Sequence, residues 1–329
     1  MAEKIDLFIG FDLGGTFLKY ALGNSRGEIL FKSKKPSKGD QSKDVIFSVF
    51  YECIDELLLK AKKKGGTVVA IGVGSPGAVN FDKGKLIGNT PNLPQWGNAE
   101  IRKRLEDKYG IPVWADNDAN LMALAESRVG AAKGYKNVIA LTLGTGIGGG
   151  ILINNELYRG HNFAGAEMGH MSIEYDGIPC DCGGRGCLER YASATAMVRN
   201  YIEKLSAKSR EIPSKVTTEL IFASAHEGDR EAIETIDETA EYLGAALASL
   251  TNIFNEEIIV IGGGVAEAGA EFIALIWQAV QSRAMKPGLI GLKLVGAKLG
   301  NDAGMYGAMS LAIDNYYATG KGKRITENG

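Results

Sequence analysis

The sequence lacks a surplus of charge, a long apolar run and a signal peptide. Its 37 lysines and arginines against 39 acidic residues leave a formal net charge of −2. Such a balance gives no electrostatic reason to expect a nucleic acid or an anionic membrane as partner. No run approaches the roughly 20 apolar residues of a membrane span, and residues 1–6 lack an apolar signal core. We therefore expect a cytoplasmic chain.

Cysteine is also scarce, with four residues in the chain. Cys53 falls on the apolar face of a predicted helix, where a buried core position is expected. The other three, Cys180, Cys182 and Cys187, crowd into one short segment. In a cytosolic protein such crowding favours metal binding over a disulfide.

Two nucleotide-binding signatures are missing: a Walker A motif and a Gly-x-Gly-x-x-Gly turn leading into a helix. The chain instead has two Gly-rich turns that each lie between apolar runs. They repeat in register, since Gly14 to Gly144 spans 144 − 14 = 130 residues and Asn24 to Asn154 spans 154 − 24 = 130. The pattern predicts strand, Gly turn and strand, used twice.

Glycine-rich turns can hold anions, because consecutive backbone N–H groups form a concave donor site. One such turn is usually only a tight turn, but three occur here at the ends of predicted strands. With a strand after the turn, as in actin-like ATPases, we expect the phosphates of a nucleotide between the first two and its nucleoside beside the third. The predicted contacts are Asp12, Gly14, Gly15, Thr16 and Lys19, then Gly144, Thr145 and Gly146, then Gly262, Gly263 and Gly264.

The order of predicted elements is strand pair, helices, strand pair, helices, which indicates two similar α/β domains. We expect a smaller domain over residues 1–118 plus about 305–320, and a larger domain over 119–304. A flexible tail is predicted over residues 320–329. The polar stretch 24–40 is interpreted as a hairpin end and a loop. His161 and His226 match no motif and are expected at the surface.

Asn117 and Asp118 follow a predicted strand and open a predicted helix. One interpretation is helix capping, since Asp and Asn are favoured at that position. The other is a general base, because phosphoryl transfer needs a carboxylate that accepts a hydroxyl proton. The two roles need not share a residue, since Asp116 can also supply the cap.

His170 and the three crowded cysteines match the ligand set of a closed, tetrahedral zinc site. The Cys-x-Cys spacing departs from the common Cys-x2-Cys, so a disulfide stays an alternative. Glu167 and Glu189 flank this cluster and can accept hydrogen bonds from sugar hydroxyls. Taken alone, they are more typical of solvated surface acids.

The chain resembles the ROK family (repressors, uncharacterised reading frames and sugar kinases), most closely its glucokinase branch. The resemblance covers nearly the whole chain. It rests on Asp12-Leu-Gly-Gly-Thr16 with Lys19, Gly72-Val-Gly-Ser-Pro-Gly77, Asn92-Leu-Pro-Gln-Trp96, Asn117-Asp118-Ala-Asn120, Leu143-Gly-Thr-Gly-Ile-Gly-Gly149, Glu167-Met-Gly-His170, Cys180-Asp-Cys-Gly-Gly-Arg-Gly-Cys-Leu-Glu189 and Ile261-Gly-Gly-Gly264. The cysteine segment is highly specific to this family, whereas the Gly turns are shared with other actin-like ATPases.

The resemblance implies two actin-like (ribonuclease H-like) ATPase domains of the α/β class with an inter-domain cleft. It implies phosphoryl transfer from ATP, with Mg²⁺, to the 6-hydroxyl of glucose, with Asp118 as base. Sugar contacts are implied for Ser75, Pro76, Gly77, Asn92, Asn117, Asp118, Glu167, His170 and Glu189. Structural Zn²⁺ is implied on His170, Cys180, Cys182 and Cys187. Asp116 stands where a Glu is common, and Gln95 where a Gly is common.

Four alternatives are considered at this point. Fructose, mannose, allose or an N-acetylhexosamine can replace glucose, and polyphosphate can replace ATP. A sugar-responsive repressor of the same family is disfavoured, because the first Gly turn begins by residue 12 and leaves no room for a DNA-binding domain. A nucleotide switch of the actin or chaperone type would not need Asn117, Asp118, Glu167 and His170 together. The family suggests a dimer or a tetramer.

Overall fold

The computed structural model describes residues 5–90, 93–265 and 269–320. Its contacts divide the chain into two compact units. Unit 1 takes the described residues up to Val129, Leu157–Gly165 and the described residues from Asn301 onward; unit 2 takes Gly130–Glu156 and Ala166–Gly300. The expected domain boundaries at residues 118 and 305 stay predictions. The expected tail lies outside the described residues from residue 321 on.

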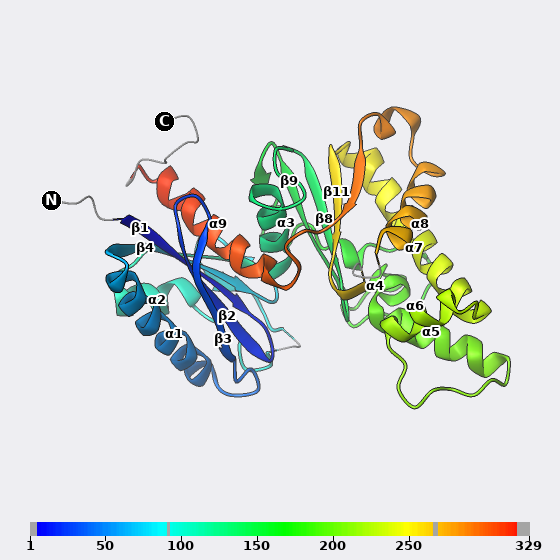
Figure 1. Cartoon of the computed structure of the whole chain (residues 1–329), viewed down its shortest axis with the longest axis horizontal. Helices are drawn as coiled ribbons and strands as arrows, with labels where there is room; N and C mark the ends of the chain where they lie inside the picture. Colours follow the sequence, from blue (N-terminus) through cyan, green and yellow to red (C-terminus); the bar gives the residue numbers. More distant parts are fainter. Residues whose placement is uncertain (1–4, 91–92, 266–268, 321–329) are drawn as a thin grey trace. The chain divides into compact units, whose positions relative to one another are not determined.

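Unit 1 is built on a five-stranded sheet in the order β3-β2-β1-β4-β7 (Figure 1). The predicted hairpin around the first Gly turn is present, with β1 and β2 antiparallel and Leu13 opposite Leu18. The strands β4 and β7 continue the sheet parallel to β1. The bounds are β1 (Ile5–Leu13), β2 (Phe17–Asn24), β3 (Ile29–Pro36), β4 (Gly66–Ser75) and β7 (Val113–Asn117).

Helices cover both faces of this sheet. One apolar core joins the sheet to α1, and a second joins Phe8 and Ala70 to Met309 and Ile313 of α9. The α9 backbone comes close to the sheet at Gly72, where any Cβ would collide with the Ala308 carbonyl. The remaining elements include a short β pair; the bounds are α1 (Lys43–Lys63), α2 (Ile101–Tyr109), α3 (Asp118–Arg128), α9 (Ala303–Ala318), β5 (Val79–Asn80) and β6 (Lys85–Leu86).

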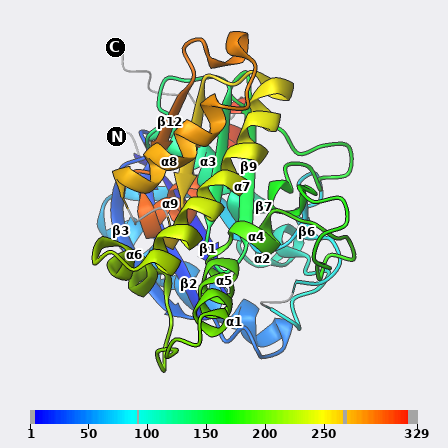
Figure 2. The same cartoon turned by 90° about the vertical axis from the view of Figure 1, so that its right-hand side faces the viewer.

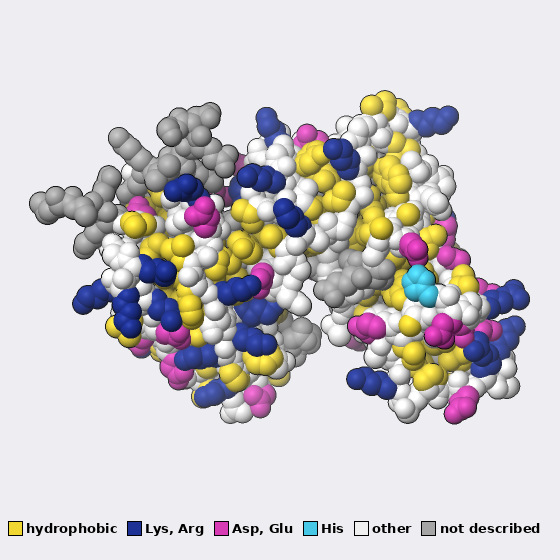
Figure 3. Space-filling view, in the orientation of Figure 1, with side chains coloured by type: hydrophobic (Ala, Val, Ile, Leu, Met, Phe, Trp, Pro, Cys, Tyr) yellow, Lys and Arg dark blue, Asp and Glu magenta, His cyan; other side chains and the backbone are white. Residues whose placement is uncertain are grey.

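The strand β3 corrects one expectation, because residues 29–36 were predicted as loop. Among the described strands, β3 pairs with β2 alone and forms the lateral edge of the sheet, with side chains alternating between half-buried and exposed. Lysines on an edge strand discourage pairing with another chain. Phe31 is covered by Lys60 of α1, whose Nζ lies 3.8 Å from the ring centroid. Basic side chains are visible over much of this face of unit 1 in Figure 3.

Unit 2 repeats the sheet of unit 1. Its five strands run in the order β10-β9-β8-β11-β12, and β8 and β9 form the second antiparallel hairpin. The strands β11 and β12 are parallel to β8, as β4 and β7 are parallel to β1. The predicted internal repeat is therefore confirmed. The bounds are β8 (Val138–Leu143), β9 (Ile147–Ile153), β10 (Glu156–Leu157), β11 (Ile258–Gly262) and β12 (Lys293–Gly296).

The core of unit 2 lies between this sheet and the helices that follow it, with α7 and α8 side by side (Figure 2). These helices approach closely at Gly244, where a Cβ would collide with Ala279. Asp229 caps α7 through the Ala232 N–H. Within the described residues, no helix is both long and apolar enough to cross a bilayer. The bounds are α4 (Glu189–Ala192), α5 (Ala194–Ala207), α6 (Thr218–His226), α7 (Arg230–Phe254) and α8 (Ala270–Gln281).

Candidate active site

Several predicted site residues of unit 1 lie at the carboxyl ends of its parallel strands. Asp12 lies opposite Gly74 on β4, and Gly74 lies opposite Asp116 on β7. Ser75 lies opposite Asn117 in the same way. Because β1, β4 and β7 are parallel, this edge carries the carboxyl ends of all three strands. Open α/β sheets bind their ligands at that edge.

Asp12 lies near the carboxyl end of β1. Its Oδ2 lies 3.4 Å from Lys19 Nζ, and the same Nζ donates to the Asn301 carbonyl at 2.8 Å. Burial raises the pKa of the Asp12 carboxyl, although Lys19 acts in the opposite direction. Gly304 at the start of α9 leaves room for the carboxylate, since a Cβ there would overlap it. A second cation close to Asp12 would therefore favour its ionised form.

The first Gly turn, Gly14 to Thr16, is hydrogen-bonded to Ser37, a residue that no sequence motif marks. The Ser37 hydroxyl donates to the Gly15 carbonyl at 2.7 Å, and the Ser37 N–H donates to the Thr16 carbonyl at 2.9 Å. Gly15 and Thr16 themselves are exposed. The carbonyls of the turn are thus occupied, while its exposed backbone remains available to a ligand.

The predicted sugar contacts at the end of β4, Ser75 and Pro76, are buried. Ser75 is fully buried, and its hydroxyl accepts a hydrogen bond from Trp96 Nε1 at 3.0 Å. Pro76 is buried as well, whereas Gly77 is half-buried with a φ of +85°. The Ser75 hydroxyl therefore fixes the loop, and Gly77 is its more accessible part. Asn92, a predicted sugar contact, lies outside the described residues.

Asn117, not Asp116, caps α3. Its Oδ1 accepts from the N–H groups of Ala119 and Asn120, and its Nδ2 donates to the Gly77 carbonyl at 3.1 Å. The amide is left with one N–H for any further partner. Asp118 is the first residue of α3 and is half-buried, and its Oδ1 accepts from the Ala119 N–H at 2.9 Å. Capping and carboxylate chemistry are thus divided between two neighbouring residues.

The second Gly turn lies in unit 2 and is held by the helices that follow the cysteine segment. Glu189 Oε2 accepts from the Ile147 N–H at 2.9 Å. A Cβ at Gly146 would overlap this carboxylate, which would have to move away from the turn. The Ala194 N–H donates to the Gly144 carbonyl and the Thr195 hydroxyl donates to the Thr145 carbonyl, both at 2.8 Å. Glu189 therefore supports this turn with one of its two oxygens.

The third Gly turn comes after β11, next to the strand that leads into the second turn. Gly262 pairs with Thr142 of β8. Gly263 has a φ of +87° and packs against the Leu143 backbone so closely that a side chain would collide with it. Gly264 is exposed and has no atom within 4 Å of the place a Cβ would take. The predicted nucleotide residues of unit 2 thus converge at the ends of β8 and β11.

His170 and the three clustered cysteines form a compact set of potential metal ligands. One ligand atom from each lies within 4.8 Å of all the others. Cys180 Sγ is 3.7 Å from His170 Nδ1, and Cys182 Sγ is 3.6 Å from Cys187 Sγ. The sulfurs are farther apart than the roughly 2.05 Å of a disulfide. The four thiols of the chain, including the buried Cys53, are free.

The thiols of this cluster differ in how easily they ionise, because a hydrogen bond from the Gly184 N–H lowers the pKa of the exposed Cys182. Burial, reinforced by hydrogen bonds to Cys182 and Cys180, raises the pKa of Cys187 to about 12. A bound metal removes that cost, because it binds thiolates directly. Three sulfurs and one imidazole suit zinc and leave no position for substrate once all four bind. If Nδ1 of His170 bound the metal, its Nε2 would carry the proton and could donate a hydrogen bond.

Residues 8–315 match the model of the ROK family. The chain belongs to the ROK family. It is 36% identical over 311 residues to a glucokinase of Thermotoga maritima, across 92% of this chain and 96% of that protein. It is 32% identical to a xylose repressor of Caldicellulosiruptor bescii, across 95% of this chain and 79% of that protein. A solved ROK family glucokinase of Streptomyces griseus, in complex with glucose and AMPPNP, superposes with a TM-score of 0.76 at 32% identity, across 94% of this chain and 99% of that one.

Membership of the ROK family confirms the predicted fold class, with two α/β domains of the actin-like ATPase type. This ROK chain places its predicted site residues in two groups. Unit 1 carries the carboxylates Asp12 and Asp118, and unit 2 carries the metal cluster and the second and third Gly turns. Glu167 and His170 are exposed in unit 2, as are the motif-free His161 in unit 1 and His226 in unit 2.

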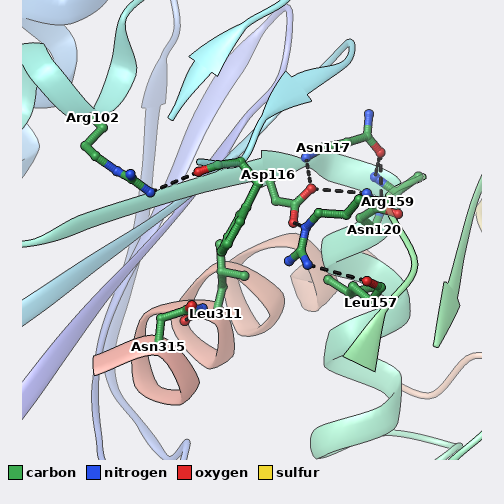
Figure 4. Close-up of polar contacts among 10 residues, drawn as sticks. Arg102, Asp116, Asn117, Asn120, Leu157, Arg159, Leu311 and Asn315 are labelled. Atoms are coloured by element: carbon green, nitrogen blue, oxygen red, sulfur yellow. Dashed lines mark hydrogen bonds and ion pairs between the residues drawn. The ribbon is translucent and has the colours of Figure 1, made fainter. Parts of the chain in front are cut away.

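Sequence reasoning missed the supporting residues of this ROK site. Ser37 lies in the stretch predicted as a polar loop, and no sequence signal marks Thr195 or Arg159. Arg159 Nε donates to Asp116 Oδ2 at 2.7 Å, immediately before the Asn117 cap (Figure 4). A buried acid such as Asp116 requires a partner. The sequence marks neither the burial nor which of the chain's basic residues is that partner.

Proposed function

We propose that this chain is an ATP-dependent glucokinase that phosphorylates the 6-hydroxyl of glucose. The observation that carries the proposal is the row of acidic groups at the carboxyl edge of the unit 1 sheet, with Asp118 opening α3 directly after the Asn117 cap. The identity to curated glucokinases over most of the chain supports the substrate assignment. The glucose and AMPPNP in the solved relative support the sugar and the nucleotide.

In this proposal Asp118 acts as the general base. It orients the sugar 6-hydroxyl and accepts its proton as the oxygen attacks the γ-phosphorus of ATP and the bond to the β-phosphate oxygen breaks. Such a base accelerates a reaction by about 10²- to 10⁴-fold. Asn117 then contributes its single remaining N–H to the sugar, because its other amide groups hold the helix and Gly77.

The phosphates are proposed to bind the exposed backbone of the Gly turns, Gly14 to Thr16 in unit 1 and Gly144 to Gly146 in unit 2. Lys19 and Thr145 are proposed to add contacts. Mg²⁺, when bound with ATP, neutralises phosphate charge, and Asp12 is the residue placed to hold it. Gly264 is proposed to adjoin the nucleoside, because its open face leaves room for a flat ring.

The sugar is proposed to bind Glu167, His170 and Glu189 of unit 2, together with Asn92 and the loop at Gly77. Glu189 has Oε1 for a sugar hydroxyl, since its Oε2 is bound to the Ile147 N–H. The metal is proposed to be a structural zinc that orients His170. Elemental analysis of freshly purified protein should find about one zinc per chain, as four ligands of this kind predict.

The test is kcat/KM across a panel of sugars with ATP and with polyphosphate. With ATP as donor, kcat/KM for glucose should exceed the values for fructose, mannose, allose and N-acetylhexosamines. A higher kcat/KM for another hexose would retain the kinase activity but replace glucose as the substrate. A higher kcat/KM with polyphosphate would replace ATP as the phosphoryl donor. The absence of a nucleic acid partner and the dimeric or tetrameric state stay predictions, which DNA-binding and sedimentation measurements would check.

A further inference from the structure

Asp116 is a buried acid immediately before the proposed catalytic turn. It is 1% exposed and is the second-last residue of β7, where it lies opposite Gly74 of β4. Taking a carboxylate out of water is costly unless it is paired and hydrogen-bonded. Its neighbours Asn117 and Asp118 have roles that need a fixed backbone. The way in which Asp116 is paired therefore bears on the geometry of the turn.

Both oxygens of Asp116 have strong donors. Oδ2 accepts from Arg159 Nε at 2.7 Å. Oδ1 accepts from the Asn117 N–H at 2.8 Å and from Asn120 Nδ2 at 3.1 Å. Figure 4 shows the Arg159 side chain directed at Asp116, with Asn117 and Asn120 beside it. One carboxylate thus joins the arginine to the backbone before α3 and to its first turn.

Arg159 is itself held in place. It comes from Leu157–Gly165, a segment that packs with unit 1 although its neighbours in sequence belong to unit 2. Its Nη1 donates to the Leu157 carbonyl at 3.4 Å, and its guanidinium lies 4.0 Å from the centroid of the Phe81 ring. The Gly165 N–H donates back to the Arg159 carbonyl at 2.9 Å. Because these contacts already restrain the Arg159 side chain, it loses little conformational entropy when it pairs with Asp116.

We propose that Arg159 is a positioning residue for the phosphoryl-transfer reaction, acting through Asp116 on the Asn117–Asp118 turn. This inference rests on the proposed function of Asp118. Arg159 fixes Asp116, Asp116 fixes the Asn117 N–H and the Asn120 side chain, and Asn117 caps the helix that Asp118 opens. Loss of the guanidinium leaves a buried, unpaired carboxylate that must recruit water or another donor. The turn then shifts, and small shifts of a base cost large factors in rate.

The same arginine anchors the start of a segment that leads in sequence to Glu167 and His170. The segment closes on itself at Gly165 within unit 1. A second ion pair, between Arg128 and Asp314, lies at the far end of α3.

The experiment compares Arg159→Gln with Arg128→Gln, both in the full chain. Each variant removes a guanidinium that pairs with a carboxylate, at 2.7 Å and 2.8 Å in the two pairs, at opposite ends of α3. Arg159→Gln should lower kcat with ATP and the preferred sugar about 10- to 100-fold, with KM for ATP changed less than about threefold. Arg128→Gln should keep kcat within about threefold. Arg159→Lys should recover part of the loss, because it restores the charge without the planar fork.

A second readout does not depend on activity. Amide hydrogen exchange at Asn117 and Asn120 should accelerate in Arg159→Gln and stay near wild type in Arg128→Gln. Equal loss of kcat in both variants, or a loss confined to KM, would overturn the positioning role. If wild type phosphorylates no sugar, the proposed function fails, and exchange alone then decides whether Arg159 fixes the turn. If Arg159→Gln does not fold, Arg159→Lys carries the same comparison.

Discussion

The two sheets of the molecule share one strand order and differ at the edge where ligands bind. In unit 1 that edge carries Asp12, Asp116 and Asp118. In unit 2 Thr142 takes the place of Asp12, since it lies opposite Gly262 as Asp12 lies opposite Gly74. The repeated frame thus carries charged side chains at this edge in one copy, and an uncharged side chain beside glycine backbone in the other.

This difference separates two kinds of chemistry. Carboxylates can hold a metal ion or accept a proton, but they repel phosphate unless a cation lies between them. Glycine backbone offers N–H groups without charge and admits a ligand closely. Unit 1 therefore suits the reacting centre, and unit 2 suits the remainder of a nucleotide. The sheet supplies the frame, and the residues at its edge supply the roles.

The two Gly turns also differ in what holds them. The first is bonded to Ser37, which lies between β3 and α1. The second is bonded to Glu189 and Thr195, which follow the cysteine cluster. A change at the cluster should therefore reach the second turn and leave the first unchanged.

The largest effect is expected at the base. Asp118→Asn keeps the size of the side chain and removes the proton acceptor, so kcat should fall about 10²- to 10⁴-fold. Glucose affinity measured by calorimetry should stay close to wild type. Asp107→Asn, which removes an exposed carboxylate from α2, should keep full activity. A near-normal kcat for Asp118→Asn would remove Asp118 from the mechanism.

The next effect concerns the metal cluster in unit 2. Cys187→Ser should abolish zinc binding by elemental analysis and lower kcat/KM for the sugar roughly 10- to 100-fold, as expected when support of a bound histidine is lost. Cys53→Ala removes a buried thiol outside the cluster and should retain zinc. Full zinc content in Cys187→Ser, or none in wild type, would argue against the site.

A stability effect should distinguish two glycines of the second turn. Gly146→Ala places a methyl group against the Glu189 carboxylate and should lower the free energy of unfolding by about 1–3 kcal/mol. Gly144→Ala meets no atom nearer than 3.9 Å and should change it little. Urea unfolding of the ligand-free protein measures both. Equal stability of the two variants would mean that Glu189 does not hold this turn.

The smallest effect is a pH-dependent gain in stability at Asp12. Burial raises the pKa of Asp12 above its usual 3.8, so the folded protein bears a cost for its ionised form at neutral pH. Asp12→Asn should therefore raise the free energy of unfolding at pH 7. The difference from wild type should shrink as pH falls and wild-type Asp12 takes up its proton. A difference that grows toward acid pH would reverse the sign and contradict the account.

Much of this site could be predicted because its signals are local. Glycine repeats, the Asn117–Asp118 pair and the Cys/His segment each depend on a few neighbouring residues. The hairpins and buried strands followed from apolar runs bounded by glycine. The cap was predicted as a function of this turn, but its assignment to Asn117 needed the backbone geometry.

The rest depends on contacts between distant residues. Arg159 and Asp116 are 43 residues apart in sequence, and Ser37 and Gly15 are 22 apart. Nothing local to an arginine indicates which buried acid it pairs with. The strand β3 escaped prediction for a related reason: an edge strand with one exposed face and several lysines has the composition of a loop. Pairing with β2, not its own apolar content, makes it a strand.

Identifying the reaction product is the sharpest test of the proposed glucokinase activity. Wild-type protein incubated with glucose, ATP and Mg²⁺ is followed by phosphorus and proton nuclear magnetic resonance. We expect glucose 6-phosphate and ADP in equal amounts, with the new phosphate ester on the C6 oxygen. ADP formed with inorganic phosphate and no sugar phosphate, or no turnover with any sugar of the panel, would contradict it.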